Sequence, residues 1–107
     1  MKLSQKKCVP CEGGMLPFTQ EEIEQYLSKL EEAWELLQEK KLKKEYVFDN
    51  FKQAIGFVNK VAIVAEKENH HPDIAIHYNK VEIILWTHAI GGLSENDFIL
   101  AAKIDLI

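Results

Sequence analysis

The chain has 107 residues, of which 47% are hydrophobic and 28% are charged, which suits one soluble domain rather than two. Its 13 Lys and Arg residues against 17 Asp and Glu residues give a formal net charge of −4. This charge argues against a dedicated nucleic-acid binder, which usually carries a basic face. No run of eighteen apolar residues predicts a membrane span. No secretory signal is visible either, which favours the cytoplasm; removal of a mitochondrial or plastid targeting peptide is the alternative left open.

Residues 1–16 are expected to form an irregular N-terminal arm ahead of a single domain at 17–107. The arm holds both cysteines of the chain, Cys8 and Cys11, as a lone Cys-x-x-Cys. A zinc site needs two more ligands, and a thioredoxin-like redox pair needs a strand before it and a helix directly after it. The flanking Pro and Gly residues predict a loop instead. We therefore expect the arm to have no function, or at most a stabilising disulfide.

The first helix is predicted to begin after Thr19, because Glu22 completes a capping box three residues later. Apolar residues then follow helical spacing as far as Leu30, where the helix should end. Two short strands are expected next, at 34–38 and 42–48, joined by a charged turn at 39–41. The first of these segments also suits a helix, and that alternative stays open.

A long helix is predicted from a cap at Asp49 or Asn50 to about Asn69. Its expected core stripe comprises Phe51, Ala54, Ile55, Val58, Val61, Ala62 and Ala65. Further apolar residues, Phe57, Ile63 and Val64, widen this surface, and so apolar a helix is normally covered on two sides. In so small a domain, a second subunit is the expected second cover.

Two strands should follow at 73–78 and 81–88, joined by a two-residue turn at Asn79-Lys80. Ile84 and Trp86 fall on the face away from the core, a second indication of an oligomer. Gly91-Gly92 predicts a turn, and Ser94 with Asp97 predicts the cap of a last helix reaching about Lys103.

The predicted order is helix, strand, strand, helix, strand, strand, helix. This order is typical of an α+β domain with a four-stranded, largely antiparallel sheet and three helices on one face.

All four histidines lie between residues 70 and 88. If 78 pairs with 81 in the hairpin, then 71 pairs with 88, so His70, His71 and His88 should converge at its open end. His77, beside the turn, is expected to be a solvent-facing strand residue. Histidine gives and takes protons near neutral pH, so three of them in one place predict acid–base chemistry.

Two carboxylates are expected to frame these histidines. Glu66 lies one turn before His70 on the same helix, and Asp97 can approach from the first turn of the last helix. They would hold tautomers, tune pKa values or bind a substrate amine. Zinc is the main rival interpretation, but no His-x-His or His-x-x-x-His spacing supports it. With no phosphate-binding loop or placed nucleophile, the chain indicates acid–base chemistry on a small molecule without a cofactor.

Glu66-x-x-x-His70-His71-Pro72, followed at set distances by Tyr78, His88 and Asp97, resembles the signature of the pterin-4a-carbinolamine dehydratases. Asn79-Lys80-Val81, Thr87-His88 and Gly92-Leu93-Ser94 match as well, and the similarity spans about residues 17–105.

The resemblance implies dehydration of 4a-hydroxytetrahydrobiopterin to quinonoid dihydropterin and water, a step of tetrahydrobiopterin recycling. It implies that His70, His71 and His88 are the active-site histidines, with His70 and His88 as the acid–base pair. It gives supporting or substrate-binding roles to Glu66, Pro72, Tyr78, Thr87 and Asp97, and it implies neither a metal nor a cofactor.

One departure concerns Ile74, where close relatives often carry an aromatic residue; aromatic packing on the pterin would then come from elsewhere, such as Trp86. The expected partners are a pterin substrate and further copies of this chain, as a homodimer or homotetramer through helix 50–69, the sheet edge or both. Some family members serve as dimerisation cofactors of a transcription factor. That binding role, and a pterin- or molybdopterin-related role, are the alternatives to the dehydratase.

Overall fold

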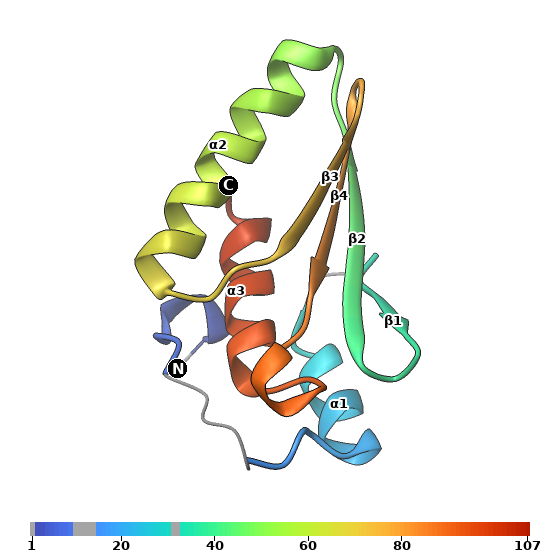
Figure 1. Ribbon diagram of the computed structural model, residues 1–107, viewed down its shortest axis with the longest axis vertical. Helices are drawn as coiled ribbons and strands as arrows, with labels where there is room; N and C mark the ends of the chain where they lie inside the picture. The colour runs from blue at the N-terminus through green and yellow to red at the C-terminus, as the bar shows by residue number, and fades with distance from the viewer. Residues whose placement is uncertain (1, 10–14, 31–32) are drawn as a thin grey trace.

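The computed structural model describes residues 2–9, 15–30 and 33–107 (Figure 1). Its elements are η1 (Leu3–Gln5), α1 (Gln20–Leu27), β1 (Glu35–Leu37), β2 (Lys41–Val47), α2 (Phe51–Glu68), β3 (Asp73–His77), β4 (Lys80–Leu85), η2 (His88–Ile90) and α3 (Glu95–Asp105). The strands form one sheet in the order β1-β2-β4-β3, and every neighbouring pair is antiparallel. The predicted α+β fold is confirmed.

The core lies between the sheet and the helices α2 and α3, which pack on one of its faces (Figure 1). The sheet contributes fully buried side chains from alternate positions: Leu42, Val81, Ile83 and Leu85. From the helices come Ala54, Val61, Phe98, Leu100 and Ile104. The strands therefore follow the alternation expected of a sheet with one face on the core.

The helix starts confirm the capping signals in the sequence. Thr19 and Glu22 form the capping box of α1, and Asn50 accepts a hydrogen bond from the Gln53 N–H at the start of α2. Ser94 and Asp97 form the capping box of α3. Each cap satisfies backbone N–H groups that a helix start leaves without an intrahelical partner.

The buried face of α2 differs from the predicted stripe. Phe57 lies in the core, whereas Phe51 is 50% exposed and Ala62 is also exposed. The observed stripe continues to Glu68 near the end of the helix. The error arose because nearly every turn of α2 is apolar on several sides, so periodicity alone did not identify the side that packs.

Both hairpin turns begin earlier than predicted. In the second hairpin His77 pairs with Lys80, so the turn is Tyr78-Asn79, and Tyr78 adopts the left-handed conformation at φ 53°. In the first, Gln38 and Glu39 take positive φ angles and Lys41 already pairs with Leu37. Strand β4 ends at Leu85 rather than at residue 88.

The described part of the N-terminal arm packs against the domain. The short helix η1 contacts α3, and Leu3 is only 7% exposed.

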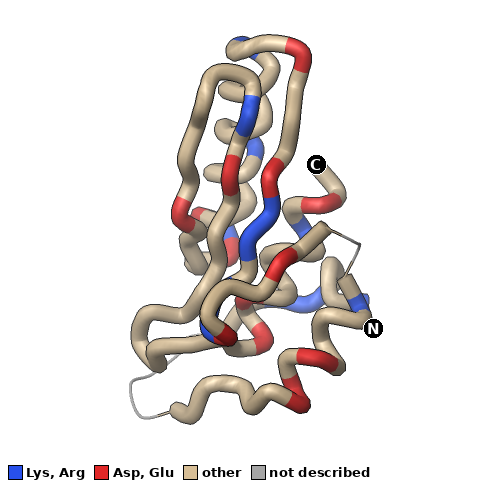
Figure 2. Tube along the Cα trace, turned by 90° about the vertical axis from the view of Figure 1, so that its right-hand side faces the viewer, with Lys and Arg blue, Asp and Glu red and all other residues tan. Residues whose placement is uncertain are grey.

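Acidic and basic residues are interspersed along the sheet (Figure 2), where Lys43 pairs with Glu82 across β2 and β4 at 2.9 Å. Among the described residues, no helix combines the length and the apolar character needed to cross a membrane.

Candidate active site

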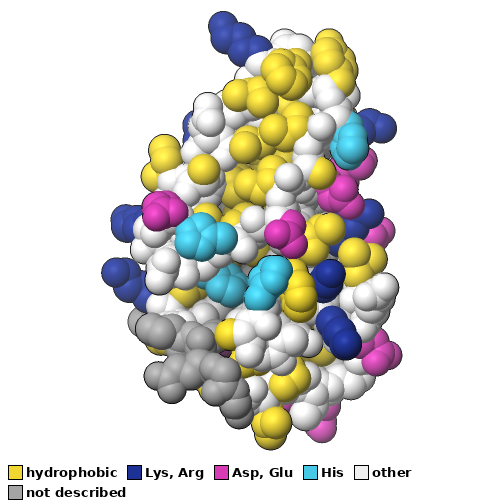
Figure 3. Space-filling model, viewed as in Figure 1, with side chains coloured by type: hydrophobic (Ala, Val, Ile, Leu, Met, Phe, Trp, Pro, Cys, Tyr) yellow, Lys and Arg dark blue, Asp and Glu magenta, His cyan; other side chains and the backbone are white. Residues whose placement is uncertain are grey.

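A cavity of about 450 Å³ opens at the end of the sheet opposite the second hairpin turn. Its lining includes His70, His71, Pro72, Trp86, Thr87 and His88. The chain enters it directly after α2 ends, where Asn69 adopts the left-handed conformation at φ 52°. Figure 3 shows histidine side chains gathered on this face of the molecule. The structure thus brings together the three histidines that the sequence predicted to converge.

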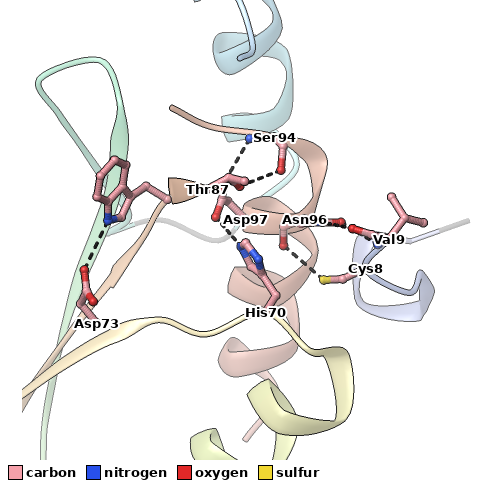
Figure 4. A network of polar contacts seen from close by, with 9 residues as sticks. Cys8, Val9, His70, Asp73, Thr87, Ser94, Asn96 and Asp97 are labelled. Atoms are coloured by element: carbon pink, nitrogen blue, oxygen red, sulfur yellow. Dashed lines mark hydrogen bonds and ion pairs between the residues drawn. The ribbon is translucent and has the colours of Figure 1, made fainter. Parts of the chain in front are cut away.

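His70 makes a short polar contact with a buried carboxylate. Its Nε2 lies 2.7 Å from Oδ1 of Asp97, and its side chain is 12% exposed (Figure 4). A carboxylate only accepts hydrogen bonds, so Nε2 carries the proton in this pair and Nδ1 is the acceptor nitrogen of the neutral ring. The contact fixes the tautomer and the orientation of His70.

Asp97 is completely buried, and its second oxygen is fully engaged. Oδ2 accepts from the Thr87 hydroxyl at 2.7 Å and from the Ser94 N–H at 3.0 Å. The Thr87 hydroxyl has a single hydrogen, so at its 2.9 Å contact with Ser94 it accepts from the Ser94 hydroxyl. A buried carboxylate is tolerated only with such partners. The hydrogen bonds that cap α3 and the hydrogen bond that orients His70 therefore belong to one network centred on Asp97.

His71 has a carboxylate partner in a more open setting. Its Nε2 lies 3.0 Å from Oε2 of Glu66, but the two side chains are 57% and 80% exposed. Solvent screens such a pair, so Glu66 holds His71 much more loosely than Asp97 holds His70. The two predicted carboxylates thus serve different histidines.

His88 lies on an aromatic neighbour. Its ring centroid is 4.0 Å from that of Trp86, and the Trp86 indole N–H donates to Oδ2 of Asp73 at 3.3 Å. Lys41 of β2 lies beside Trp86, and its ammonium nitrogen is 4.5 Å from the Trp86 ring centroid. Trp86 therefore has a cationic neighbour on one strand and an anionic neighbour on another, and it lines the cavity beside His88.

The predicted pairing of residues 71 and 88 is wrong, although the convergence is right. The ladder places Asp73 opposite Ile84, so His71 is level with Trp86, two positions before His88. His88 reaches the cavity because the chain leaves β4 and turns through η2, closed by Gly91 at φ 65° and by a Thr87–Gly92 bridge. A short helical turn, rather than strand pairing, positions this histidine.

Two residues discussed with the site lie elsewhere. Tyr78, predicted to support the site, occupies the hairpin turn at the other end of the sheet and is 66% exposed. The turn position separates Tyr78 from the cavity within one chain, so its supporting role stays a prediction. His77 is an exposed residue of β3, which agrees with its predicted surface position.

The cavity also includes residues that the sequence did not single out. Val9 of the arm and Asn96 of α3 line it, together with Asp73. No local pattern identifies Val9, because its place depends on a contact 87 residues along the chain.

Cys8 is a free thiol, whereas Cys11 lies outside the described residues. Burial, followed by the nearby charge of Glu68, raises the Cys8 pKa to about 12. The described residues include no group of three or more His, Cys, Asp or Glu side chains placed to hold a metal ion.

The fold and the cavity define a small α+β protein with a cavity lined by three histidines. Residues 16–107 match the family model described as pterin 4 alpha carbinolamine dehydratase, and the chain belongs to this family.

Similar proteins cover almost the whole chain. A protein of Nitrosospira multiformis is 52% identical over 105 residues, covering 98% of this chain and 91% of its own. One from Alkaliphilus metalliredigens is 47% identical, covering 96% and 93%. The names of both mark them as candidate pterin-4-alpha-carbinolamine dehydratases. The crystal structure of a transcriptional coactivator/pterin dehydratase from Brucella melitensis is 31% identical, with a TM-score of 0.78, covering 84% of this chain and 96% of that one.

Proposed function

We propose that this protein dehydrates 4a-hydroxytetrahydrobiopterin to quinonoid dihydropterin and water in tetrahydrobiopterin recycling. The observation that carries the proposal is the cavity with three histidines, one of them held by a buried carboxylate. Membership of the pterin carbinolamine dehydratase family supports the substrate class. The cavity volume of about 450 Å³ is within the range of small-molecule sites.

The reaction requires an acid near the hydroxyl on C4a and a base near the neighbouring N5. The bond from C4a to the hydroxyl oxygen breaks, the N5 proton leaves, and the N5 electron pair forms the C4a–N5 double bond. A general acid protonates the departing hydroxyl and a general base accepts the N5 proton. We assign these roles to His70 and His88, which line the same cavity from the end of α2 and from η2.

Asp97 supports the acid–base chemistry through His70. By accepting from Nε2 it leaves Nδ1 as the nitrogen that exchanges a proton with substrate. Thr87 and Ser94 hold the carboxylate in place from the other side. This arrangement uses a buried charge to keep one imidazole in a single tautomer and orientation.

His71 and Trp86 are assigned to substrate binding. The exposed His71–Glu66 pair can adjust to a ligand at little cost, which suits an orienting role. Trp86 offers a planar aromatic surface on which the pterin ring can lie. It would take the place of the aromatic residue that close relatives often carry where this chain has Ile74.

We also propose that the protein works as a homodimer or homotetramer. Phe51 and Ile63 of α2 are 50% and 69% exposed, and Ile76 of the edge strand β3 is 37% exposed. Apolar side chains on two neighbouring elements favour burial against further copies of the chain. Light scattering on wild type and on Ile63→Glu tests this: a wild-type oligomer that dissociates in the variant is expected, and a monomeric wild type contradicts it.

The proposed activity is tested by mixing the purified protein with freshly generated 4a-carbinolamine and following quinonoid dihydropterin formation. We expect the wild type to accelerate dehydration above the spontaneous rate. No acceleration would favour the binding-module alternative, in which the same apolar surface of α2 docks a transcription factor. Acceleration only with a molybdopterin-type substrate would favour that other pterin-related role.

A further inference from the structure

The N-terminal arm is held at the edge of the cavity by a side chain of α3. The Asn96 carboxamide accepts from the Val9 N–H at 2.9 Å and donates to the Val9 carbonyl at 2.6 Å (Figure 4). Asn96 is only 3% exposed and directly precedes Asp97, the partner of His70. The arm is therefore docked on the same helical turn that positions the proposed acid–base histidine.

A second anchor lies behind the arm, outside the cavity lining. The Cys8 N–H donates to Oε1 of Glu68 at 2.9 Å, and Oε2 of Glu68 accepts from Lys103 at 2.8 Å. The Cys8 thiol also contacts the Asn96 carbonyl at 3.6 Å. Glu68 is 7% exposed, so this charge is buried at the end of α2 and neutralised by α3. A buried charge of this kind is costly unless it is paired, and here each Glu68 oxygen has a partner.

The pinned backbone places an apolar residue at the edge of the cavity. Val9 lines the cavity and is 61% exposed, although its own N–H and carbonyl are both bonded. Its neighbours in the lining are largely imidazole and polar groups. A flat heteroaromatic substrate is stabilised by apolar contacts beside these polar groups, and Val9 joins Pro72, Trp86 and Ala89 as the apolar part of the lining.

We propose that residues 2–9, the described first part of the arm, form a wall of the active site: Val9 contacts the substrate, and Asn96 and Glu68 are positioning residues that hold it there. This inference rests on the proposed function for the identity of the substrate. It also gives the arm a role, in place of the functionless segment expected from the sequence.

Two variants test the wall from opposite sides. Glu68→Ala removes the Cys8 anchor without replacing a residue of the cavity lining, and Val9→Gly removes the side chain while keeping the backbone bonds. Both should raise the KM for the carbinolamine about fivefold or more with kcat changed less than about twofold, since only a binding contact is lost. Val9→Ile keeps a branched apolar side chain at this position and should have the KM of the wild type. Lys6→Ala, which breaks an arm contact to Glu95 outside the cavity, is the matched control and should leave KM unchanged.

A second readout does not depend on turnover. Diethyl pyrocarbonate labelling, followed by mass spectrometry, gives the ratio of modification at His70 to modification at His77, the exposed histidine outside the cavity. We expect this ratio to rise in Glu68→Ala and Val9→Gly and to stay at the wild-type value in Lys6→Ala. An unchanged ratio in both wall variants overturns the inference, as does an unchanged KM. Failure of the proposed function would instead show as no turnover in wild type, and the labelling ratio would then decide about the wall.

Discussion

His70 and Asp97 are 27 residues apart in the chain, yet His70 Nε2 and Asp97 Oδ1 lie 2.7 Å apart, with the carboxylate fully buried. The histidine comes from the break after α2 and the aspartate from the first turn of α3. Because Asp97 also completes the α3 capping box, folding of α3 and orientation of the imidazole depend on the same side chain.

Asp97→Asn should lower kcat much more than it raises KM. An amide nitrogen facing His70 would donate where the carboxylate accepts, which forces the opposite imidazole tautomer. Replacing the carboxylate that holds a catalytic imidazole in its tautomer costs up to about 10⁴-fold in kcat in a Ser-His-Asp triad, so a loss of about tenfold or more is expected here. Steady-state kinetics on the folded variant measures the effect, and circular dichroism confirms that α3 is intact. A kcat within about twofold of wild type would show that the tautomer of His70 is unimportant.

Glu66→Gln provides the matched comparison, because it changes the other carboxylate–histidine pair. That pair is exposed and screened by water, so its loss should change kcat by less than about threefold. The same assay measures both variants side by side. A loss as large as that of Asp97→Asn would contradict this ranking, because His71 would then be as important to the reaction as His70.

Acid should weaken the folded state in part through Glu68. Burial alone would raise its pKa, but hydrogen bonds from Lys103 and from the Cys8 N–H outweigh burial and lower it. A group with a lowered folded pKa stabilises fully above its unfolded pKa of about 4.3 and loses this contribution as pH falls through the folded value. Urea unfolding at a series of acidic pH values should therefore show a smaller acid-induced loss of unfolding free energy in Glu68→Gln than in wild type. Superimposable pH profiles would contradict this assignment.

Gly92 should not tolerate a side chain. A Cβ on Gly92 would lie 2.6 Å from the Cβ of Pro17. Gly92 also forms the bridge to Thr87 that helps to place His88. Gly92→Ala should lower the free energy of unfolding by about 1–3 kcal/mol, the usual cost of overpacking. Gly56→Ala is the control: its Cβ would meet open space on α2, so a gain of about 0.5–1 kcal/mol is expected from helix propensity. Urea denaturation of both variants at one protein concentration tests the pair, and equal effects would contradict it.

The elements of this fold were predictable where the signal is local. Capping by Thr19, Asn50 and Ser94 depends on residues within three positions, and the alternation along β4 depends on every second residue. The turn at Tyr78-Asn79 was misplaced because a tyrosine there adopts a left-handed conformation that Asn or Gly would normally take. Context in the sheet overrides this local preference.

The candidate site was predictable in membership more than in arrangement. Histidine chemistry and the family signature indicated His70, His71, His88 and Asp97, but no sequence pattern says which carboxylate meets which histidine. The part of Val9 was out of reach, because its docking depends on Asn96 from the other end of the chain. Contacts of this kind arise from packing and leave no periodic trace in the sequence.

The most direct test of the account is the initial rate of carbinolamine dehydration by wild type, His70→Ala and His77→Ala at equal protein concentration. His77 is the internal control, a histidine on the exposed side of β3 outside the cavity. We expect the wild type and His77→Ala to accelerate the reaction equally, and His70→Ala to lose about 100-fold or more of that acceleration, as removal of a general acid or base does. Full acceleration by His70→Ala would contradict the assignment of His70 as an acid–base residue.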